Sequence, residues 1–400
     1  MRIAFLTPEF VTDCQDAGGL GNYLNRFGKV LVEQGHQVEI FVSSKSKPRV
    51  LQHEGMYVER VWPYPGRWWM RIVERLLRII RAENDWDTVF RAWCMSRELS
   101  AAMERRHKTR PFDIVQSSDL MSVGLAVRRT RNRLHVVRCS SACDLYNIAD
   151  GVTGRINMMM EKIERTSIRK ADLSYAPSRL VADHYRQHYS IPMEVVRPPR
   201  AVEATPLEYP ASGLPPRFFI HFGQLCRRKG TIWLGEALQR AFRSEPDLTM
   251  VWIGRGSFQE VDRALAGLGR HRANVHVLYP MRKPELYSVL KCAEAAVLPP
   301  LVDNLPNAVI ESLMLGIPVI GTKGASVDEL VEQDKTGELV PLGDVDALAA
   351  AILKVWRGQS KAKKGFTWQS AIAMEMEPHW AVERFFALNA SRDATNFKPA

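Results

Sequence analysis

The stretch LPPLVDNLPNAVIESLMLGIPVIG, residues 298–321, decides the fold of the second half of this chain. An apolar strand ends in two prolines, and a polar loop then leads into an apolar helix that we expect to end at Gly316. The strand Pro318–Ile320 follows at once. We expect Asn304 to be the N-cap of this helix and Pro306 to lie in its first turn, where a missing N–H costs nothing. Strand, loop, helix and strand in succession predict a parallel α/β sheet.

The loop ahead of this helix combines an anion site with two carboxylates. A helix N-terminus offers backbone N–H groups and a positive dipole end to a phosphate, and it needs no carboxylate to do so. Asp303 and Glu311 therefore indicate a ligand that also carries hydroxyl groups, as a sugar and a ribose do. Two simpler interpretations stay open at this point: Asp303 caps the helix, and Glu311 lies on a solvated face.

Length and charge set the first limits on function. A chain of 400 residues is long for one hydrophobic core and sufficient for two domains. Lys and Arg number 55 against 44 Asp and Glu, a net charge of +11 that favours acidic partners such as nucleotides, nucleic acid or anionic lipid. The charge alone does not choose among these partners.

The sequence carries no pattern of a secretory or membrane-spanning segment. The start, MRIAFLTPEF, is a short strand-like run without a small-residue cleavage site, and no apolar run reaches the ~18 residues of a membrane span. The six cysteines are scattered, and Cys139 and Cys143 lack the second pair or the histidines of a zinc site. We therefore expect a cytoplasmic protein with reduced cysteines and without a bound metal.

The first half begins with another strand–loop–helix–strand unit. Strands are expected at Ile3–Leu6 and Val38–Ser43, and the loop DAGGLGNY, residues 16–23, precedes a helix that ends near Gly35. The glycines do not complete a GxGxxG dinucleotide pattern, because Leu24 stands where the third glycine belongs. The loop is either a flexible turn or a place where the backbone approaches a ligand.

Strands and helices alternate along the rest of the chain, with one interruption. Further strands are expected at 113–116, 134–138, 173–176, 218–223, 250–254, 275–278 and 295–300, and helices at 123–129, 158–169, 232–242, 258–267, 284–290 and 345–356. The segment 197–216 is rich in proline and lacks periodicity. We predict two facing doubly wound, Rossmann-like parallel-sheet domains whose glycine-bearing loops meet at one crevice.

The predicted domain bounds follow from that interruption. Residues 1–197 form the N-terminal domain, 198–217 a linker and 218–375 the C-terminal domain. The helical tail 376–400 is expected to return to the N-terminal domain. The segment RWWMRIVERLLRIIR, residues 67–81, predicts a basic amphipathic helix that lies on an anionic membrane surface or, more commonly for such a pattern, on its own domain.

Several motifs in a fixed order resemble one enzyme family. GGLGNY, GQLCRRKG, VWIGRGS, DNLPNAVIESLMLGIPVIG and DKTGELVPLGDVDALAAAI resemble the retaining glycosyltransferases of family 4, which have the two-domain GT-B fold. The resemblance covers most of the chain and is strongest between Phe219 and Ile352. It implies transfer of a hexose from a nucleotide diphosphate sugar, a UDP- or GDP-sugar, with retention at the anomeric carbon and without a metal or other cofactor.

The resemblance also implies roles for individual residues. Glu311 matches the carboxylate that accepts hydrogen bonds from the ribose, and Asp303 stands where the general pattern has a Glu that contacts the donor hexose. Lys229 matches the lysine that binds the diphosphate, whereas Gln224 replaces the accompanying arginine. Arg227 or Arg228 is a candidate for the missing charge, and either is otherwise a solvated side chain.

The N-terminal half supplies fewer matched positions. Gly18 and Gly19 match the glycine pair whose backbone closes over the diphosphate, and Ser140 stands where the family often has a histidine. The catalytic residues implied are Lys229, Asp303 and Glu311; the donor-binding residues are Gly18, Gly19, Gly223, Gln224, Arg228, Lys229, Gly254, Asn304, Leu305, Pro306, Asn307 and Glu311. As a hypothesis, we favour front-face displacement in which the leaving phosphate takes the acceptor's proton.

Three kinds of acceptor and two other functions stay open. The resemblance allows a lipid-linked, polysaccharide or small-molecule acceptor, and the basic helix favours a lipid-linked one at the cytoplasmic face of the membrane. Gln224, Asp303 and Ser140 favour a catalytically inactive GT-B scaffold that binds a membrane or a sugar nucleotide. A sugar-nucleotide epimerase shares the fold. A nicotinamide oxidoreductase lacks its third glycine, and no nucleic-acid-binding motif appears.

Overall fold

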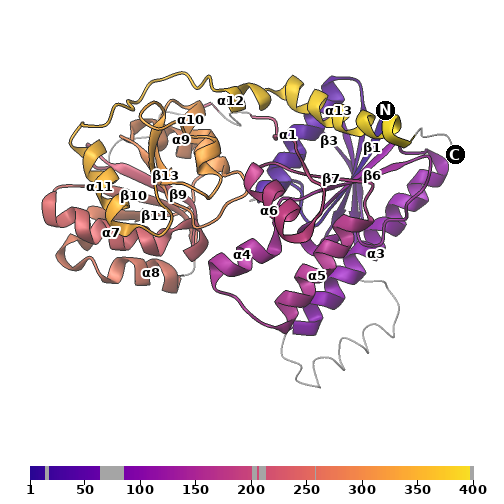
Figure 1. The fold of residues 1–400 in the computed structure, drawn as a ribbon, viewed down its shortest axis with the longest axis horizontal. Helices are drawn as coiled ribbons and strands as arrows, with labels where there is room; N and C mark the ends of the chain where they lie inside the picture. Colours follow the sequence, from indigo (N-terminus) through magenta and orange to yellow (C-terminus); the bar gives the residue numbers. More distant parts are fainter. Residues whose placement is uncertain (14–17, 64–84, 201–204, 207–212, 257, 397–400) are drawn as a thin grey trace. The chain divides into compact units, whose positions relative to one another are not determined.

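The computed structural model of the chain describes residues 1–13, 18–63, 85–200, 205–206, 213–256 and 258–396 (Figure 1). It divides into two compact units. Unit 1 comprises Met1–Pro199 and Glu375–Ala400, and unit 2 comprises Arg200–Met374. The basic amphipathic helix predicted at residues 67–81 lies outside the described residues.

Unit 1 is built on a sheet of eight strands in the part of the chain that the structure describes. Their order is β3-β4-β2-β1-β5-β6-β7-β8, and every neighbouring pair is parallel except β3 and β4. The strands are β1 (Arg2–Thr7), β2 (Gln37–Ser43), β3 (Val50–His53), β4 (Met56–Val61), β5 (Ile114–Ser118), β6 (Leu134–Arg138), β7 (Leu173–Ala176) and β8 (Glu194–Val195). Strand order reverses between β1 and β5, where ligands of such sheets bind.

Helices accompany these strands as the alternation predicted, with one exception. The helices are α1 (Gly19–Glu33), α3 (Asp85–Thr109), α4 (Cys143–Asp150), α5 (Arg155–Lys170), α6 (Arg179–Tyr189) and α13 (Pro378–Asn396). The helix predicted at 123–129 is wrong: a short 3-10 turn at Leu120–Ser122 stands before it, and the chain continues in turns. Met121 and Ser122 have φ of 57° and 51°, which no right-handed helix accommodates.

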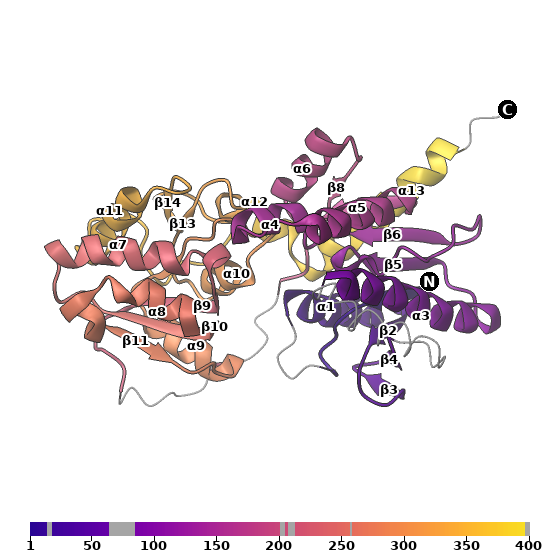
Figure 2. The same ribbon diagram turned by 90° about the horizontal axis from the view of Figure 1, so that it is seen from below.

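The hydrophobic core of unit 1 contains side chains from both the N-terminal and the C-terminal part of the chain. The apolar face of α1, including Leu24 and Phe27, is buried against the strands with Phe5 and Ile40. The C-terminal helix α13 packs beside α1 (Figures 1 and 2), and the ring of its buried Phe385 lies 5.3 Å from that of Phe27. The last helix therefore belongs to the hydrophobic core of unit 1.

Unit 2 is a second doubly wound domain. Its described residues form six parallel strands in the order β11-β10-β9-β12-β13-β14. The strands are β9 (Phe219–Leu225), β10 (Met250–Gly256), β11 (Val275–Leu278), β12 (Ala296–Leu298), β13 (Val319–Thr322) and β14 (Gly337–Val340); the helices are α7 (Thr231–Ser244), α8 (Phe258–Ala266), α9 (Lys283–Cys292), α10 (Asn307–Met314), α11 (Val345–Trp356) and α12 (Ala371–Glu375). Here strand order reverses between β9 and β12.

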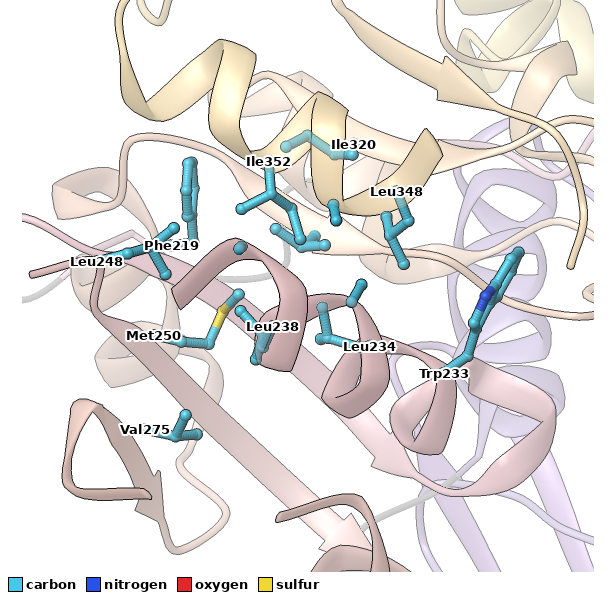
Figure 3. Close-up of a cluster of buried hydrophobic side chains, with 14 of the residues drawn as sticks. Phe219, Trp233, Leu234, Leu238, Leu248, Met250, Val275, Ile320, Leu348 and Ile352 are labelled. Atoms are coloured by element: carbon cyan, nitrogen blue, oxygen red, sulfur yellow. The ribbon is translucent and has the colours of Figure 1, made fainter. Parts of the chain in front are cut away.

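Two helices lie side by side over one face of this sheet and close its core. Leu234 and Leu238 of α7 and Leu348 and Ile352 of α11 point toward the strands, where they meet Met250 among others (Figure 3). These side chains recur at intervals of four residues, as the apolar stripe of a helix does. The packed face holds the strands rigid, so that the loops at their carboxyl ends have fixed positions.

Two residues of the expected linker are attached to unit 2. The guanidinium of Arg217 lies over the ring of Trp356, 4.1 Å from its centroid, and that of Arg200 lies 5.5 Å from the centroid of Trp368. Such cation–π contacts hold a chain without regular structure against a domain. The contact-based division accordingly places Arg200 and everything up to Met374 in unit 2.

The helix of the opening stretch begins later than predicted. α10 starts at Asn307, and Pro306 is its N-cap, with φ −68° and ψ 113°. Asn304 is therefore not the N-cap: its backbone N–H donates instead to Asp303 Oδ1 over 2.9 Å, in a turn that precedes the helix. The predicted end is confirmed, because Gly316 follows the C-cap with φ +69°.

Candidate functional site

The loops after β9 and β12 lie next to each other where the strand order of unit 2 reverses. Lys229 ends a 3-10 turn after β9, and Asp303 follows β12. The backbone N–H of Leu301 donates to the carbonyl of Arg228 over 2.8 Å. Gly230, with φ +79°, lies so near Pro299 that a Cβ would overlap its carbonyl oxygen. Only glycine allows this approach, which brings Lys229 within reach of Asp303.

Lys229 and Asp303 form an ion pair at this point. The ammonium of Lys229 donates to Asp303 Oδ2, while Oδ1 accepts the N–H of Asn304. The carboxylate is 9% exposed and the lysine side chain 28%, so the pair is shielded but open to one side. Asp303 makes no capping bond to α10. The interpretation of Asp303 as a helix cap is therefore wrong, and its carboxylate faces Lys229.

A second ion pair lies on the neighbouring helices. The ammonium of Lys283, the first residue of α9, donates to Glu311 Oε1 of α10. Glu311 is buried, so the interpretation that it lies on a solvated face is wrong. The sequence analysis missed Lys283. The sequence RKPEL, residues 282–286, could have indicated it, because it places a basic residue at the start of the helix that follows β11.

Two predicted glycines, Gly223 and Gly254, lie on the neighbouring strands β9 and β10. Gly223 has φ +114°, and a Cβ on Gly254 would overlap the carbonyl oxygen of Gly223. Gln224 is exposed, and Arg228 Nη2 lies 3.4 Å from its Oε1. The guanidinium of Arg228 thus lies beside the position where the resemblance expects an arginine. Arg227 is exposed, and its backbone N–H donates to Glu260.

The remaining predicted residues of unit 2 connect the two ion pairs. Asn304 and Pro306 are buried, whereas Leu305 and Asn307 are half-buried. The hydroxyl of Ser326 donates to the backbone carbonyl of Asp303 over 2.8 Å and fixes the start of this segment. Most predicted site residues of unit 2 therefore lie on the loops after β9 and β12 or near the carboxyl ends of β9 and β10, whereas Glu311 lies within α10.

A buried histidine, His221, forms hydrogen bonds that connect the strands and the helix at this edge. His221 Nδ1 lies 2.8 Å from the carbonyl of Val297, so it donates, and Nε2 then accepts from the hydroxyl of Thr231 over 3.1 Å. Burial lowers the pKa of His221 to about 4, partly offset by the bond to Val297. The neutral ring links β9, β12 and the start of α7, which are the elements that position Lys229 and Asp303.

In unit 1, the predicted glycines begin α1. Gly18 is the N-cap, and Gly19 is the first helical residue; both are exposed. Glu9, just after β1, accepts the N–H of Gly21 over 3.0 Å, and a Cβ on Gly18 would lie 2.7 Å from that carboxylate. The glycine pair therefore lets Glu9 reach the helix N-terminus. Sequence reasoning missed Glu9, although an acidic residue directly after a strand is a signal.

Ser140 belongs to a hydrogen-bonded cluster around Asp119. Its hydroxyl donates to Asp119 Oδ1 over 3.1 Å, and the backbone N–H groups of Ser141 and Ala142 donate to Oδ2 over 2.8 and 3.2 Å. Asp119 follows β5 and is fully buried. It too escaped the sequence analysis. Ser140 thus helps to hold the loop after β6 on Asp119.

The described residues contain no group of three or more His, Cys, Asp or Glu side chains arranged to hold a metal ion. Among the helices that the structure describes, none is both long and apolar enough to cross a membrane.

Two family models match this chain, one to each half. Residues 18–199 match the glycosyl transferase 4-like domain, and residues 216–357 match the glycosyl transferases group 1. Among curated proteins, the chain is 31% identical over 104 residues to an uncharacterised glycosyltransferase of Methanocaldococcus jannaschii, which covers 26% of this chain and 25% of that one. It is 30% identical over 161 residues to the putative colanic acid biosynthesis glycosyltransferase WcaL of Escherichia coli, covering 38% and 37%.

The curated relatives match over part of their length, whereas solved structures match throughout. The chain spans less than half the length of these relatives. Sucrose-phosphate synthase from Thermosynechococcus elongatus superposes with a TM-score of 0.76 at 18% identity, over 98% of this chain and 99% of that one. Anabaena HepE in complex with UDP and glucose gives 0.70 at 16%, over 98% and 100%. Two matched families and one shared fold place this chain among the glycosyltransferases of family 4 type, with the GT-B fold.

Proposed function

We propose that this protein transfers a hexose from a UDP- or GDP-sugar to a lipid-linked, polysaccharide or small-molecule acceptor, with retention at the anomeric carbon and without a metal ion. One observation carries the proposal. Two lysine–carboxylate pairs, Lys229 with Asp303 and Lys283 with Glu311, lie on the loops after β9 and β12 and on helices α9 and α10 of unit 2. The carboxyl edge of a sheet, at a reversal of strand order, suits a nucleotide.

The two pairs divide the donor between them. Lys229, with Arg228 beside it, is suited to bind the diphosphate, whose charge grows as the glycosidic bond breaks. Once the donor arrives, the lysine exchanges a carboxylate for a phosphate, and Asp303 becomes an acceptor for hexose hydroxyls. Glu311, held by Lys283, is a carboxylate suited to accept hydrogen bonds from ribose hydroxyls.

The relatives support a sugar nucleotide as the donor and are compatible with several classes of acceptor. HepE was solved with UDP and glucose, WcaL is named for colanic acid biosynthesis, and a galactosyltransferase of Escherichia coli, 24% identical over 139 residues, acts on a diphosphoundecaprenol-linked sugar. We extend these chemistries to this chain as a proposal. A lipid-linked acceptor would place the protein at the cytoplasmic face of a membrane, with residues 67–81 as the candidate contact.

The proposed mechanism is a front-face displacement. The bond between the anomeric carbon and the phosphate oxygen breaks as the bond to the acceptor oxygen forms, and the leaving phosphate takes the acceptor's proton. Asp303 and Glu311 each hold an ammonium, which suits binding better than nucleophilic attack. The protein then contributes position and electrostatic stabilisation.

A donor screen read by mass spectrometry, followed by NMR of the product, tests the proposal. One nucleotide sugar should be consumed with an acceptor present, and the new anomeric centre should keep the configuration of the donor. A product of inverted configuration contradicts the mechanism. Activity that disappears with a chelator and returns with a divalent cation contradicts metal independence.

A second candidate is an inactive scaffold that binds a sugar nucleotide or a membrane. The replacement of the expected arginine by Gln224 and the shorter Asp303 favour it. Thermal shift with UDP, GDP and ADP, combined with the donor screen, separates the candidates, because a ligand that binds the folded state raises the melting temperature. Binding without transfer supports the scaffold. Turnover of a sugar nucleotide without an acceptor supports an epimerase.

A further inference from the structure

Arg138 is a buried cation with two nitrogen atoms that lack a hydrogen-bond partner in the described structure. It is the last residue of β6, at the carboxyl edge of the unit 1 sheet, and it is 5% exposed. Its Nε and Nη1 atoms are buried and find no hydrogen-bond partner among the residues that the structure describes. Buried guanidinium groups are normally paired, since an unmatched buried charge is costly. Such a group is a candidate for binding an anion from outside the chain.

Two other buried arginines of unit 1 have carboxylate and carbonyl partners. Arg133, directly before the same strand, is 3% exposed; its Nη2 donates to Glu104 over 2.6 Å and to the carbonyl of Arg128 over 2.9 Å, although its Nε has no partner in the described structure. Arg197, also 5% exposed, donates to the carbonyl of Pro177 over 2.6 Å and contacts Glu375. Arg138 is therefore set apart by its environment and not by burial alone.

The position of the Arg138 guanidinium is fixed by an aromatic ring. Its central carbon lies 3.7 Å from the centroid of the Tyr23 ring, a cation–π contact that does not use the N–H groups of Nε and Nη1. The Tyr23 hydroxyl is 2.9 Å from that of Tyr175, which donates to Gln116 over 2.8 Å. Burial raises the pKa of Tyr23, so the phenol stays neutral and provides no counter-charge.

The neighbouring carboxylates are engaged by other donors. Asp119, next to the β6 end, accepts the N–H of Leu120 over 2.8 Å in addition to the groups from Ser140, Ser141 and Ala142. Glu9 accepts from Gly21. Neither carboxylate accepts a hydrogen bond from Nε or Nη1 of Arg138 in the described structure. The local charge balance at the end of β6 thus leaves room for one more anion.

The start of α1 already has a negative partner. Tyr23 lies in the second turn of this 15-residue helix, and Glu9 accepts the N–H of Gly21 in the first turn. The positive end of the helix dipole is therefore matched by Glu9, and binding of a further oxyanion depends on Arg138.

We propose that Arg138, at the carboxyl end of β6, binds an oxyanion carried by the acceptor, a phosphoryl or carboxylate group. The inference rests on the proposed function, because unit 2 carries the candidate donor site and unit 1 is left for the acceptor. The planar fork of a guanidinium matches both oxyanions, and burial strengthens the contact. A neutral sugar hydroxyl accepts a hydrogen bond but brings no charge to balance the buried guanidinium. A charged acceptor suits Arg138 better than a neutral one.

The test is thermal shift of the full chain with inorganic phosphate, glucose 6-phosphate, glucuronate and glucose, each against NaCl of equal ionic strength. We expect at least one of the three oxyanions to raise the melting temperature and glucose to leave it unchanged. The arm that responds identifies a phosphoryl or a carboxylate group. Arg138→Met should abolish the shift, and Arg138→Lys should weaken the affinity about tenfold, because an ammonium lacks the fork.

Arg129→Met is the matched control, since Arg129 lies between β5 and β6 at the other end of the strand and is 56% exposed. It should respond like the wild type. UDP, GDP and ADP serve as the donor-site arm, which Arg138→Lys should leave unchanged. No response of the wild type to any oxyanion overturns the inference, and so does an unchanged response of Arg138→Lys. Loss of nucleotide binding in that variant would assign Arg138 to the donor instead. Failure of the nucleotide arm in the wild type alone contradicts the proposed function and not this site.

Discussion

Lys283 and Glu311 form an ion pair in which one partner is much better shielded than the other. The lysine side chain is 35% exposed and the carboxylate 7%. A shielded carboxylate that loses its counter-charge is destabilised, because burial penalises the charged form. Lys283 is thus a positioning residue that holds and orients Glu311.

Lys283→Met should weaken the binding of the preferred nucleotide diphosphate about tenfold, about 1.4 kcal/mol, because Glu311 loses the ammonium that orients it. Isothermal titration calorimetry measures the change. Lys291→Met, an exposed lysine in the last turn of the same helix, is the control and should leave the affinity unchanged. Equal affinities of Lys283→Met and the wild type would contradict the positioning role.

His221 makes the stability of unit 2 depend on pH. Burial holds its pKa at about 4, below the ordinary 6.5 of the unfolded chain, so the unfolded state takes up a proton first as pH falls. Its contribution to stability is complete above pH 6.5 and is lost as the pH falls toward 4. The free energy of unfolding should drop by about 2 kcal/mol between pH 7 and pH 5 from this group.

Urea unfolding of the wild type and of His221→Asn at these two pH values tests the assignment. Asparagine keeps a donor for the Val297 carbonyl but does not titrate. The variant should show a smaller decrease in stability on acidification. His135 of unit 1, whose pKa burial also lowers to about 4, should leave part of the decrease in place. Equal decreases in both proteins would contradict the role of His221.

At the scale of an element, α13 contributes to unit 1 through one helix face. Phe385 is fully buried, and its ring lies 5.3 Å from that of Phe27 and 6.1 Å from that of Tyr175. Phe385→Ala should cost about 3–5 kcal/mol of unfolding free energy through lost burial and the cavity left behind. Trp380→Ala, on the same helix but 58% exposed, should stay within about 0.5 kcal/mol. Comparable effects in urea unfolding would contradict the packing described.

The sequence predicted the elements whose buried apolar residues recur at a regular period. It did not predict the features that depend on backbone conformation in loops. The strands at 134–138 and 173–176 and the helix at 345–356 were confirmed with their bounds, because their apolar residues recur at the strand or helix period. The helix expected at 123–129 is absent: Met121 and Ser122, just before it, adopt positive φ, and the chain turns at 123–126, which the sequence pattern does not indicate. Likewise, Pro306 takes the N-cap from Asn304 through its extended ψ.

At the scale of the whole chain, the alternation of strands and helices predicted two doubly wound sheets, and the structure and the comparisons confirm this fold. The site was partly predictable for the same reason. Lys229 and Asp303 come directly after β9 and β12, and residues that follow neighbouring strands at a reversal of order meet at one edge. Lys283 and Arg138 escaped because their significance depends on side-chain contacts across elements.

The central claim is that the carboxyl edge of the unit 2 sheet binds a nucleotide diphosphate through Lys229. Isothermal titration calorimetry of UDP, GDP and ADP with the wild type, Lys229→Met and Lys335→Met tests it most directly. Lys335 is an exposed lysine ahead of β14 that pairs only with Glu332 in the described structure, so it serves as the control. We predict one-to-one binding of at least one nucleotide, a loss of tenfold or more, at least ~1.4 kcal/mol, in Lys229→Met, and no change in Lys335→Met. Absence of binding by all three nucleotides, or equal affinities in the wild type and Lys229→Met, would contradict the account.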